Sequence, residues 1–426
     1  MPRLLLFAAT TGYQIRVFAE AARRLGVDLT LATDRCHVLE DPWGDRAIPV
    51  RFGNMPGSLA ACLDAIGDRR FDAVVAVGDA PTVLAADVTS AFDIPFHPPA
   101  AVRACHDKYR ARQLFQAAGL NVPRFFRIPL SDDPDAAARR ATYPCVLKPL
   151  GLSASRGVIR ANHPDEFRAA FARIKTLLEN APDIRMAREE HSQYLQVEAY
   201  LPGREFAVEG ILTRGAPRIL AIFDKPDPLQ GPYFEETIYV TPSRENAAAQ
   251  GSMCESVARA VRVLGLYHGP FHAELRFNDT GVWMLEVAAR PIGGLCSKAL
   301  RFGSGMPLEE LILRHAIGED IVALQPAAAA AGVMMIPIPR GGVYEDVAGL
   351  DEARAVEGVD DVIITAKVGQ LLTPLPEGAS YLGFIFARGA DPAAVERALR
   401  LAHAKLGFRI AMALPTLRST RSTLNS

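Results

Sequence analysis

Apolar runs alternate with amphipathic segments along the first hundred residues. Buried-strand patterns occur at RLLLFAA (residues 3–9), VDLTLATD (27–34) and DAVVAVGD (72–79), with helical spacing between them. Strands that alternate with helices indicate a parallel sheet that is covered on both faces. We therefore predict a small doubly wound α/β domain over residues 1–107.

The middle of the chain, residues 108–325, carries both helical and strand periodicity. Helices are predicted at DKYRARQLFQAAG (107–119) and DEFRAAFARIKTLLE (165–179), and strands at YPCVLKPL (143–150) and YLQVEAYLPGREFAVEGIL (194–212). Further strands and one helix follow up to residue 289. This mixture predicts an α+β domain built on an antiparallel sheet with a covering helix.

A composition shift at QPAAAAAG, near residue 326, marks the start of a third unit. Strand patterns follow at GVMMIPIP (332–339) and YLGFIFARG (381–389). The last helix has Asp391 as its N-cap and Pro392 at its first position, which are favoured residues at those places. We predict a small α+β domain over residues 326–426.

Composition and charge narrow the classes of partner. The 426 residues carry a formal net charge of −1, and the six cysteines form no CxxC pair. A near-neutral chain has no general attraction for nucleic acid or anionic membranes, and no apolar run approaches the roughly 18 residues of a membrane span. We expect a reduced, cytoplasmic protein with neither of these partners. If it assembles with itself, a homodimer is expected, because dimers are the commonest closed assembly.

A loop of small residues follows Lys148 at the end of an apolar strand. It contains Ser153, Ala154, Ser155 and Gly157. Few bulky side chains let backbone N–H groups approach phosphate oxygens, and serine hydroxyls add donors. Lys148 would supply charge to the same anion. The alternative is a plain hairpin loop with a solvated lysine.

Two glutamates, Glu198 and Glu205, flank the turn LPG in QVEAYLPGREF. Exposed edge backbone near Glu198 could hydrogen-bond an adenine base, and Glu205 could accept from ribose hydroxyls. The alternative is a pair of surface glutamates on a hairpin.

The richest stretch is FHAELRFNDTGVWMLEVAARPIGG, residues 271–294. Its two strand patterns, joined by NDTG, would place Glu274 and Glu286 side by side. Neighbouring carboxylates repel unless a cation neutralises them, and oxygen-only ligands suit Mg²⁺. Arg290 could hold an anionic oxygen near the metal. The alternative is a buried ion pair between Glu286 and Arg290.

Residues 223–243, which include Phe234, mix charged and apolar side chains, and they are predicted to line a substrate pocket. Lys225 could meet a substrate carboxylate and Glu236 an ammonium; the alternative is an ordinary surface loop. His272 could accept a proton, although packing is favoured. Two residues after the glycine pair could also line this pocket: Cys296 and Ser297.

These segments, in this order, resemble the ATP-grasp superfamily of carboxylate–amine ligases. The resemblance implies an ATP-grasp domain over residues 108–325 with a mobile lid at about 132–196, and a closing domain over 326–426. It implies ATP and two Mg²⁺ ions as cofactors, with Mn²⁺ as a substitute. The implied roles are: Lys108 and Lys148 on the phosphates, Ser153 to Gly157 as a lid loop, backbone at Glu198, Ala199 and Leu201 on adenine, Glu205 on ribose, Glu274 and Glu286 on Mg²⁺, and Arg290 on an acyl-phosphate.

One position departs from the superfamily's Glu-x-Asn-x-Arg pattern. Ala288 stands where asparagine would be a further metal ligand. Alanine here, with the segments GVMMIPIPRGG and ASYLGFIFARG near the C-terminus, is most similar to the L-amino-acid ligases that make dipeptides.

The resemblance implies ATP-dependent amide or peptide bond formation between a small-molecule carboxylate and an amine. The reaction would pass through an acyl-phosphate and release ADP and phosphate. Alternatives are a bicarbonate-using carboxylase, a purine-pathway ligase of the same superfamily, and a non-catalytic ATP-binding scaffold. Retention of both lysines, both carboxylates and Arg290 argues against the scaffold.

Overall fold

The N-terminal domain is a parallel sheet with helices on both faces. The computed structural model describes residues 1–9, 14–34, 47–181, 184 and 190–412. The strand order is β3-β2-β1-β4. The elements are β1 (Arg3–Ala8), α1 (Ile15–Leu25), β2 (Asp28–Thr33), β3 (Ala47–Pro49), α2 (Met55–Ile66), β4 (Ala73–Val77) and α3 (Asp79–Phe92).

Alternate residues of β1 explain how the sheet is covered. Leu4 and Leu6 pack in one core with Phe18 of α1, whereas Leu5 and Phe7 pack in the other with α2 and α3. Successive strand side chains point to opposite faces, so a strand buried on both sides is apolar throughout. The predicted α/β domain is confirmed; the short strand β3 was not predicted.

Two helices lead from this domain to the rest of the chain. They are α4 (Pro99–His106) and α5 (Lys108–Ala117). The Asp107 carboxylate accepts hydrogen bonds from the backbone of Tyr109 and Arg110, which satisfies N–H groups at the start of α5. This cap fixes Lys108 in the first turn of α5, at the edge of the cavity described below.

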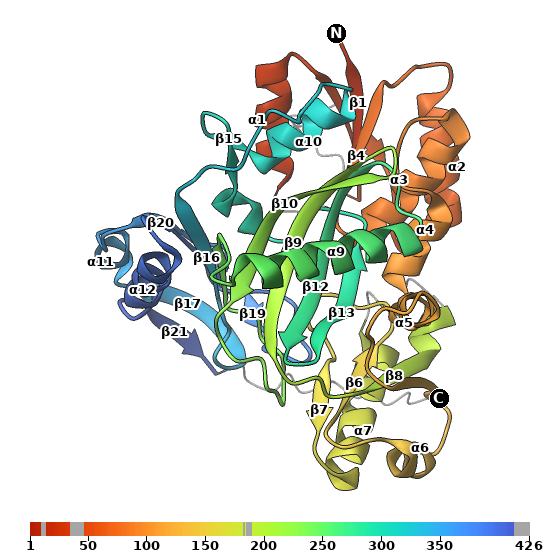
Figure 1. The fold of residues 1–426 in the computed structure, drawn as a ribbon, viewed down its shortest axis with the longest axis vertical. Helices are drawn as coiled ribbons and strands as arrows, with labels where there is room; N and C mark the ends of the chain where they lie inside the picture. The colour runs from red at the N-terminus through yellow and green to blue at the C-terminus, as the bar shows by residue number, and fades with distance from the viewer. Residues whose placement is uncertain (10–13, 35–46, 182–183, 185–189, 413–426) are drawn as a thin grey trace, which may run out of the picture.

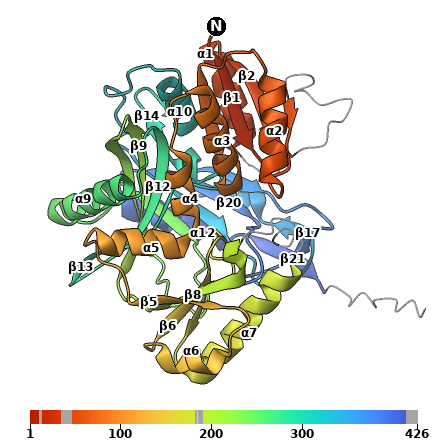
Figure 2. The same cartoon turned by 90° about the vertical axis from the view of Figure 1, so that its right-hand side faces the viewer.

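A small antiparallel sheet, here called the lid sheet, forms the lower end of the molecule (Figures 1 and 2). It begins and ends slightly outside the predicted lid limits of 132 and 196, and α6 and α7 belong to its core. Its strand order is β5-β8-β6-β7. The elements are β5 (Phe125–Pro129), α6 (Pro134–Arg140), β6 (Cys145–Pro149), β7 (Ile159–Ala161), α7 (Pro164–Asn180), η2 (Glu190–Gln193) and β8 (Tyr194–Ala199).

The central sheet has eight antiparallel strands in the order β13-β12-β9-β10-β11-β16-β20-β18. Three strands from beyond residue 326 therefore continue the sheet that earlier strands begin. Helix α9 lies across one face in Figure 1, and α10 packs on α1 of the N-terminal domain. The elements are β9 (Arg204–Thr213), β10 (Ala216–Lys225), β11 (Ile238–Thr241), α9 (Ala247–Val263), β12 (Gly269–Asn278), β13 (Gly281–Ala288), η3 (Cys296–Ala299), α10 (Leu308–Ala316), β16 (Ala330–Ile336), β18 (Val359–Ile364) and β20 (Gly383–Gly389).

The C-terminal region adds a three-stranded sheet in the order β19-β17-β21. Ala394 donates its backbone N–H to Asp391 at 2.8 Å, so the predicted N-cap of the last helix is confirmed. The remaining elements are β14 (Arg301–Phe302), β15 (Met306–Pro307), β17 (Gly342–Ala348), α11 (Leu350–Arg354), β19 (Leu371–Leu372), α12 (Pro392–His403) and β21 (Gly407–Ala411).

Neither a membrane span nor a disulfide occurs in the described ranges. No helix there combines the length and apolar character needed to cross a bilayer. The five described cysteines are free thiols: Cys62, Cys105, Cys145, Cys254 and Cys296.

A buried histidine joins the N-terminal domain to the central sheet and predicts acid sensitivity. His97 Nδ1 accepts from the Tyr267 backbone at 3.1 Å, and its Nε2 lies 3.0 Å from the Pro270 carbonyl. Burial lowers the pKa of His97 to about 4, despite the opposing hydrogen bond to Pro270. The unfolded chain has a histidine pKa of about 6.5 and so takes up a proton first as the pH falls. The free energy of unfolding should therefore decrease between about pH 6.5 and pH 4.

Replacing His97 by glutamine should remove part of this slope, since an amide can both accept from Tyr267 and donate to Pro270. Urea unfolding at pH 7.5 and pH 5 should show the wild type losing about 1–2 kcal/mol more than the variant between the two pH values. Equal losses would show that His97 does not carry the acid sensitivity.

Candidate active site

A cavity of about 390 Å³ lies where the N-terminal domain, the lid sheet and the central sheet meet. Its walls come from the ends of β1 and β4, the loop after β6, the face of β9, β11, β12 and β13, and the segment before β20. Most predicted site residues line it. They include Lys108, Lys148, Glu274, Glu286 and Arg290.

The carboxylate pair at the centre has the predicted arrangement. Glu274 of β12 is the direct cross-strand partner of Glu286 of β13, and the next pairing skips Leu285 as a bulge. Direct partners share a face of the sheet, so both carboxylates face the cavity. Each has a cation beside it: Lys225 Nζ lies 3.3 Å from Glu274, and Lys108 Nζ lies 3.5 Å from Glu286.

The lid sheet supplies a second buried charge cluster around Glu198. Lys148 Nζ lies 2.6 Å from one of its carboxylate oxygens and Arg112 Nε lies 2.5 Å from the other. Burial would raise the pKa of Glu198, but Arg112 and Lys148 together lower it to about 2. Glu198 is therefore ionised, and it holds Lys148 in place at the cavity wall.

The prediction of exposed edge backbone at Glu198 is wrong. Strand β8 lies between β5 and β6, so its backbone is paired on both sides. The Ala199 N–H donates to the Arg124 carbonyl at 2.9 Å. Ala199 and Leu201 do line the cavity, beyond the end of the paired strand.

The loop after β6 reaches over the cavity. Ser153, Ala154 and Ser155 line it, and Ala154 and Ser155 adopt left-handed backbone at φ 54° and 55°. Such conformations are uncommon outside glycine and cluster at ligand-binding loops. Gly157 was predicted to face the phosphates, but it does not line the cavity, and its N–H donates to the Pro376 carbonyl at 2.8 Å.

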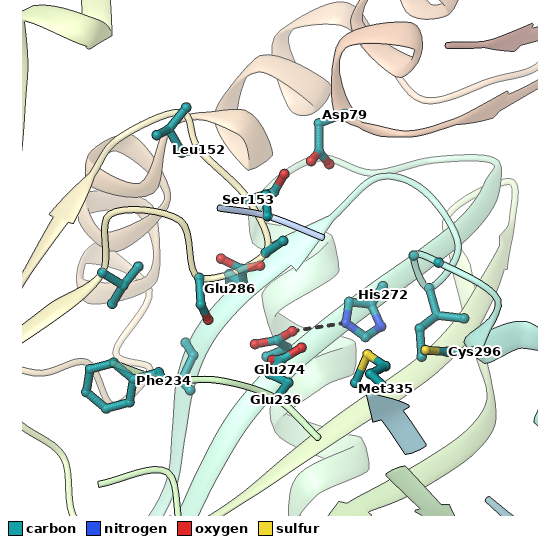
Figure 3. A pocket seen from close by; sticks show the side chains of 18 of the residues that line it. Asp79, Leu152, Ser153, Phe234, Glu236, His272, Glu274, Glu286, Cys296 and Met335 are labelled. Atoms are coloured by element: carbon teal, nitrogen blue, oxygen red, sulfur yellow. Dashed lines mark hydrogen bonds and ion pairs between the residues drawn. The ribbon is translucent and has the colours of Figure 1, made fainter. Parts of the chain in front are cut away.

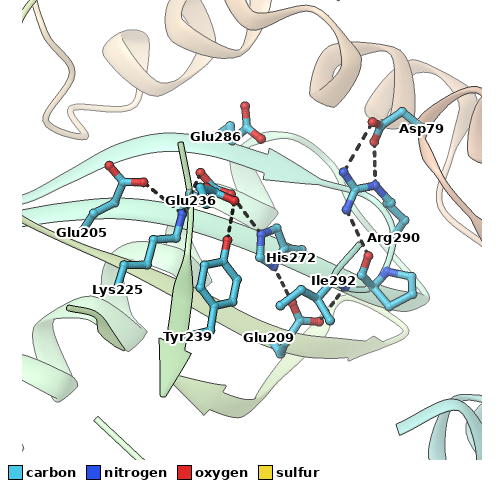
Figure 4. Close-up of polar contacts among 12 residues, drawn as sticks. Asp79, Glu205, Glu209, Lys225, Glu236, Tyr239, His272, Glu286, Arg290 and Ile292 are labelled. Carbon is cyan, nitrogen blue, oxygen red and sulfur yellow. Dashed lines mark hydrogen bonds and ion pairs between the residues drawn. The ribbon is translucent and has the colours of Figure 1, made fainter. Parts of the chain in front are cut away.

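Lys225 does not face the cavity, contrary to its predicted role with a substrate carboxylate. Its ammonium is buried among three carboxylates, at 2.9 Å from Glu205, 2.5 Å from Glu236 and 3.3 Å from Glu274 (Figure 4). Burial would lower the pKa of Lys225, yet Glu236 and the other carboxylates raise it well above its usual value. Lys225 is therefore a permanent counter-ion beneath the cavity.

Glu236 and Glu205 line the cavity above this lysine. Burial and the charge of Glu274 raise the pKa of Glu236 to about 7, although Lys225 opposes the shift. Lys225 already pairs with Glu236, so Glu236 does not require a substrate ammonium as its counter-ion. Its predicted role with such an ammonium stays a prediction. Glu205 is also held by Arg276 Nε at 2.9 Å; a carboxylate can accept further hydrogen bonds, so ribose binding stays a prediction.

His272 does more than pack, contrary to the favoured expectation. Its Nδ1 contacts Glu209 and its Nε2 lies 3.2 Å from Glu274, as Figure 4 shows in part. Burial would lower the pKa of His272, but Glu209 and Glu274 raise it to about 9. Glu209 also accepts from the Ile292 backbone at 3.2 Å. A protonated His272 thus links Glu274 to the loop that follows β13.

Arg290 pairs with a carboxylate from the N-terminal domain. Its Nε and Nη2 lie 2.7 and 3.4 Å from the two oxygens of Asp79 (Figure 4). Asp79 opens α3 directly after β4, at the carboxyl edge of the parallel sheet. The alternative of an ion pair between Glu286 and Arg290 is wrong, because each has a different partner: Lys108 for Glu286 and Asp79 for Arg290.

Two models of known families match the chain. An ATP-grasp domain matches residues 141–299, and an L-amino acid ligase C-terminal domain 2 matches residues 334–411. The chain therefore contains an ATP-grasp domain followed by an L-amino acid ligase C-terminal domain. Both parts of the resemblance seen in the sequence are thereby confirmed, and the ATP-grasp domain contains the Glu274–Glu286 pair and Arg290.

A solved L-amino acid ligase from Bacillus licheniformis has a similar fold. Its TM-score is 0.79 at 24% identity, over 96% of this chain and 99% of that one. An uncharacterised protein of Sinorhizobium fredii is 25% identical over 308 residues, 70% of this chain and 59% of that protein. Alanine–anticapsin ligase of Bacillus subtilis is 27% identical over 226 residues, 50% of this chain and 47% of that protein. This ATP-grasp chain thus spans roughly half of these curated relatives' length.

Of three predicted substrate residues, Phe234 and Cys296 line the cavity, and Ser297 does not. Phe234 packs with Val146 and Val158 of the lid sheet, and Figure 3 shows it on the opposite side of Glu274 from Cys296. Ser297 is buried outside the cavity, where its hydroxyl donates to Glu309 at 2.5 Å. Phe234 and Cys296 thus line the cavity, and their roles with a substrate stay predictions.

Sequence reasoning missed three charged residues of this ATP-grasp site: Asp79, Arg112 and Glu209. A signal existed for Asp79, because a carboxylate that follows a parallel strand lies at the edge where such sheets bind ligands. Arg112 lies within a helix and Glu209 within a strand. The sequence around each of them predicts the element and gives no sign of a functional site.

Proposed function

We propose that this protein is an ATP-dependent ligase that joins an L-amino acid, as the acid, to a small amine or a second amino acid. An acyl-phosphate would form first, and ADP and phosphate would be released. The observation that carries the proposal is that the paired Glu274 and Glu286 line one cavity together with Lys108, Lys148 and Arg290. The ligase C-terminal domain beside this ATP-grasp site supports amino acids as substrates.

The chain's own residues would act mainly through position and charge. Lys108 and Lys148 lie 15% and 14% exposed at the cavity wall and would neutralise charge spreading over the transferred phosphoryl group. Arg290, fixed by Asp79, would hold the oxygen of the developing acyl-phosphate. The loop at Ser153 to Ser155 would exclude water, which otherwise hydrolyses such an intermediate.

The donor set around the carboxylate pair fits Mg²⁺. Glu274 and Glu286 offer oxygen ligands on one face of the sheet, and hard oxygen donors are those that Mg²⁺ prefers alongside nucleotide phosphates. Bound there, Mg²⁺ would supply positive charge to the phosphate oxygens. His272 and Lys225 hold Glu274 from behind, and Lys108 approaches Glu286 from the side.

The proposal is tested by incubating the protein with Mg²⁺-ATP and pools of amino acids, then measuring nucleotide products, phosphate and product mass. ADP release that depends on amino acids, with a condensed product, supports it. AMP and pyrophosphate would exclude an acyl-phosphate. ADP release that depends on bicarbonate would favour a carboxylase, and no turnover with any acid would favour a scaffold.

Ala288 gives a prediction about metal affinity. It lies two residues after Glu286 on β13, opposite His272, and so shares the face of the carboxylate pair. A small cavity of about 30 Å³ lies beside it. Replacing Ala288 by asparagine should add an oxygen ligand and lower the Mg²⁺ concentration for half-maximal ADP release by roughly tenfold. Ala289→Asn, on the neighbouring position, is the control; equal Mg²⁺ requirements in all three proteins would contradict the assignment.

A further inference from the structure

The end of the cavity away from the lid sheet is built from apolar side chains of three neighbouring strands. Met335 of β16 and Phe384 of β20 are direct cross-strand partners. Tyr239 of β11 pairs with Val333, which lies on the same face of β16 as Met335. Met335, Phe384 and Tyr239 all line the cavity and belong to one apolar core. The side chains of this end therefore project from paired strands of the central sheet.

The loop after β13 closes this apolar end from the other side. Ile292 and Cys296 line it, and Gly293 and Gly294 between them place no side chains in it. A Cβ on Gly294 would lie 3.1 Å from the Phe384 ring. Figure 3 shows Met335 and Cys296 beside His272, on the side away from Phe234. Backbone without side chains leaves this space for a ligand.

The polar atoms of this end are already engaged or uncharged. The Tyr239 hydroxyl donates to Glu236 at 2.8 Å. Burial raises the pKa of the Cys296 thiol far above its ordinary value, so the thiol stays neutral. Gln14 and Tyr381 also line the cavity, and Gln14 Nε2 donates to the Ile292 carbonyl at 2.9 Å, but both side chains are uncharged. A charged group placed here would lose water and meet only uncharged partners, which is unfavourable. An apolar group would gain from leaving water.

The two ends of the cavity differ in what surrounds them. The end at Phe234 adjoins Lys148 and the loop after β6 that contains Ser153 and Ser155. A nucleotide base is suited to this end. The end at Met335 lies beyond Glu274 and Arg290, where an acid would be activated. We infer that the Met335 end receives the side chain of the acid substrate, and that this substrate is an amino acid with a large apolar side chain, such as leucine, methionine or phenylalanine.

This inference rests on the proposed function, and one experiment separates them. ADP release is measured with single amino acids as the acid and one fixed amine. We expect kcat/KM for leucine, methionine or phenylalanine to exceed that for alanine or aspartate by roughly 10–200-fold. In Met335→Gln, the leucine-to-alanine ratio should fall at least about tenfold, whereas Phe234→Leu should raise the KM for ATP and leave that ratio unchanged.

A binding measurement keeps the test independent of turnover. With a non-hydrolysable ATP analogue present, leucine should raise the melting temperature of the wild type more than that of Met335→Gln. Circular dichroism of the two proteins without ligand should be the same. Equal turnover of leucine, alanine and aspartate would overturn the inference and leave the ligase intact. ADP release with no amino acid at all would overturn both.

Discussion

Replacing Glu286 by glutamine should lower amino-acid-dependent ADP release by at least about 100-fold. The substitution keeps the size of the side chain and removes one carboxylate of the pair that faces the cavity. Glu286 is 31% exposed, and its nearest cation is Lys108 at 3.5 Å, so the loss of charge should barely affect folding. Initial rates with saturating Mg²⁺-ATP, and melting curves of both proteins, measure the two effects.

The matched control for this variant is Glu255→Gln, in an exposed position of α9 on the far side of the central sheet. It makes the same chemical change and should keep the wild-type rate. Wild-type activity in Glu286→Gln would remove Glu286 from the metal site and leave Glu274 without its proposed partner.

Replacing Lys225 by methionine should lower the free energy of unfolding by about 3–5 kcal/mol. Lys225 is 3% exposed and is the cation shared by Glu205, Glu236 and Glu274. Without it, three carboxylates face one another in a buried place. Protonation relieves this repulsion, so the pKa values of Glu236 and Glu274, which Lys225 lowers in the wild type, should rise in the folded variant. Stability of the variant should then be lost as the pH rises through those raised values.

Urea unfolding at pH 6 and pH 8 measures this effect, and the deficit against wild type should be larger at pH 8. Lys175→Met is the control, because Lys175 is 39% exposed and its pair with Glu179 is 3.9 Å apart; its cost should stay below about 0.5 kcal/mol. A Lys225→Met deficit as small as that of the control would show that the carboxylates do not depend on this lysine.

The local pattern of apolar and polar residues predicted those helices and strands whose formation depends on residues close together in the sequence. The strands of the N-terminal sheet are apolar throughout because both faces are covered, and Asp391 caps its helix within four residues. Glu274 and Glu286 could be paired in advance because a short turn at NDTG joins their strands and fixes the register.

Contacts between distant segments could not be predicted in the same way. Asp79 and Arg290 are 211 positions apart. The sequence around either residue gives no indication that the other is its partner. Lys225 alternates into the sheet face that meets Glu205 and Glu274, which becomes visible only when the order β12-β9-β10 is known. The same holds for β16, β20 and β18, whose periodicity predicts strands without showing that they extend the central sheet.

The most direct measurement follows one carboxylate oxygen through the reaction. An accepted amino acid labelled with ¹⁸O in its carboxylate is incubated with Mg²⁺-ATP, the amine and the protein, and the products are analysed by mass spectrometry. Attack on the γ-phosphoryl group followed by amide formation predicts one ¹⁸O atom in each released phosphate. Unlabelled phosphate with ADP, or ¹⁸O in AMP, would contradict an acyl-phosphate at this site.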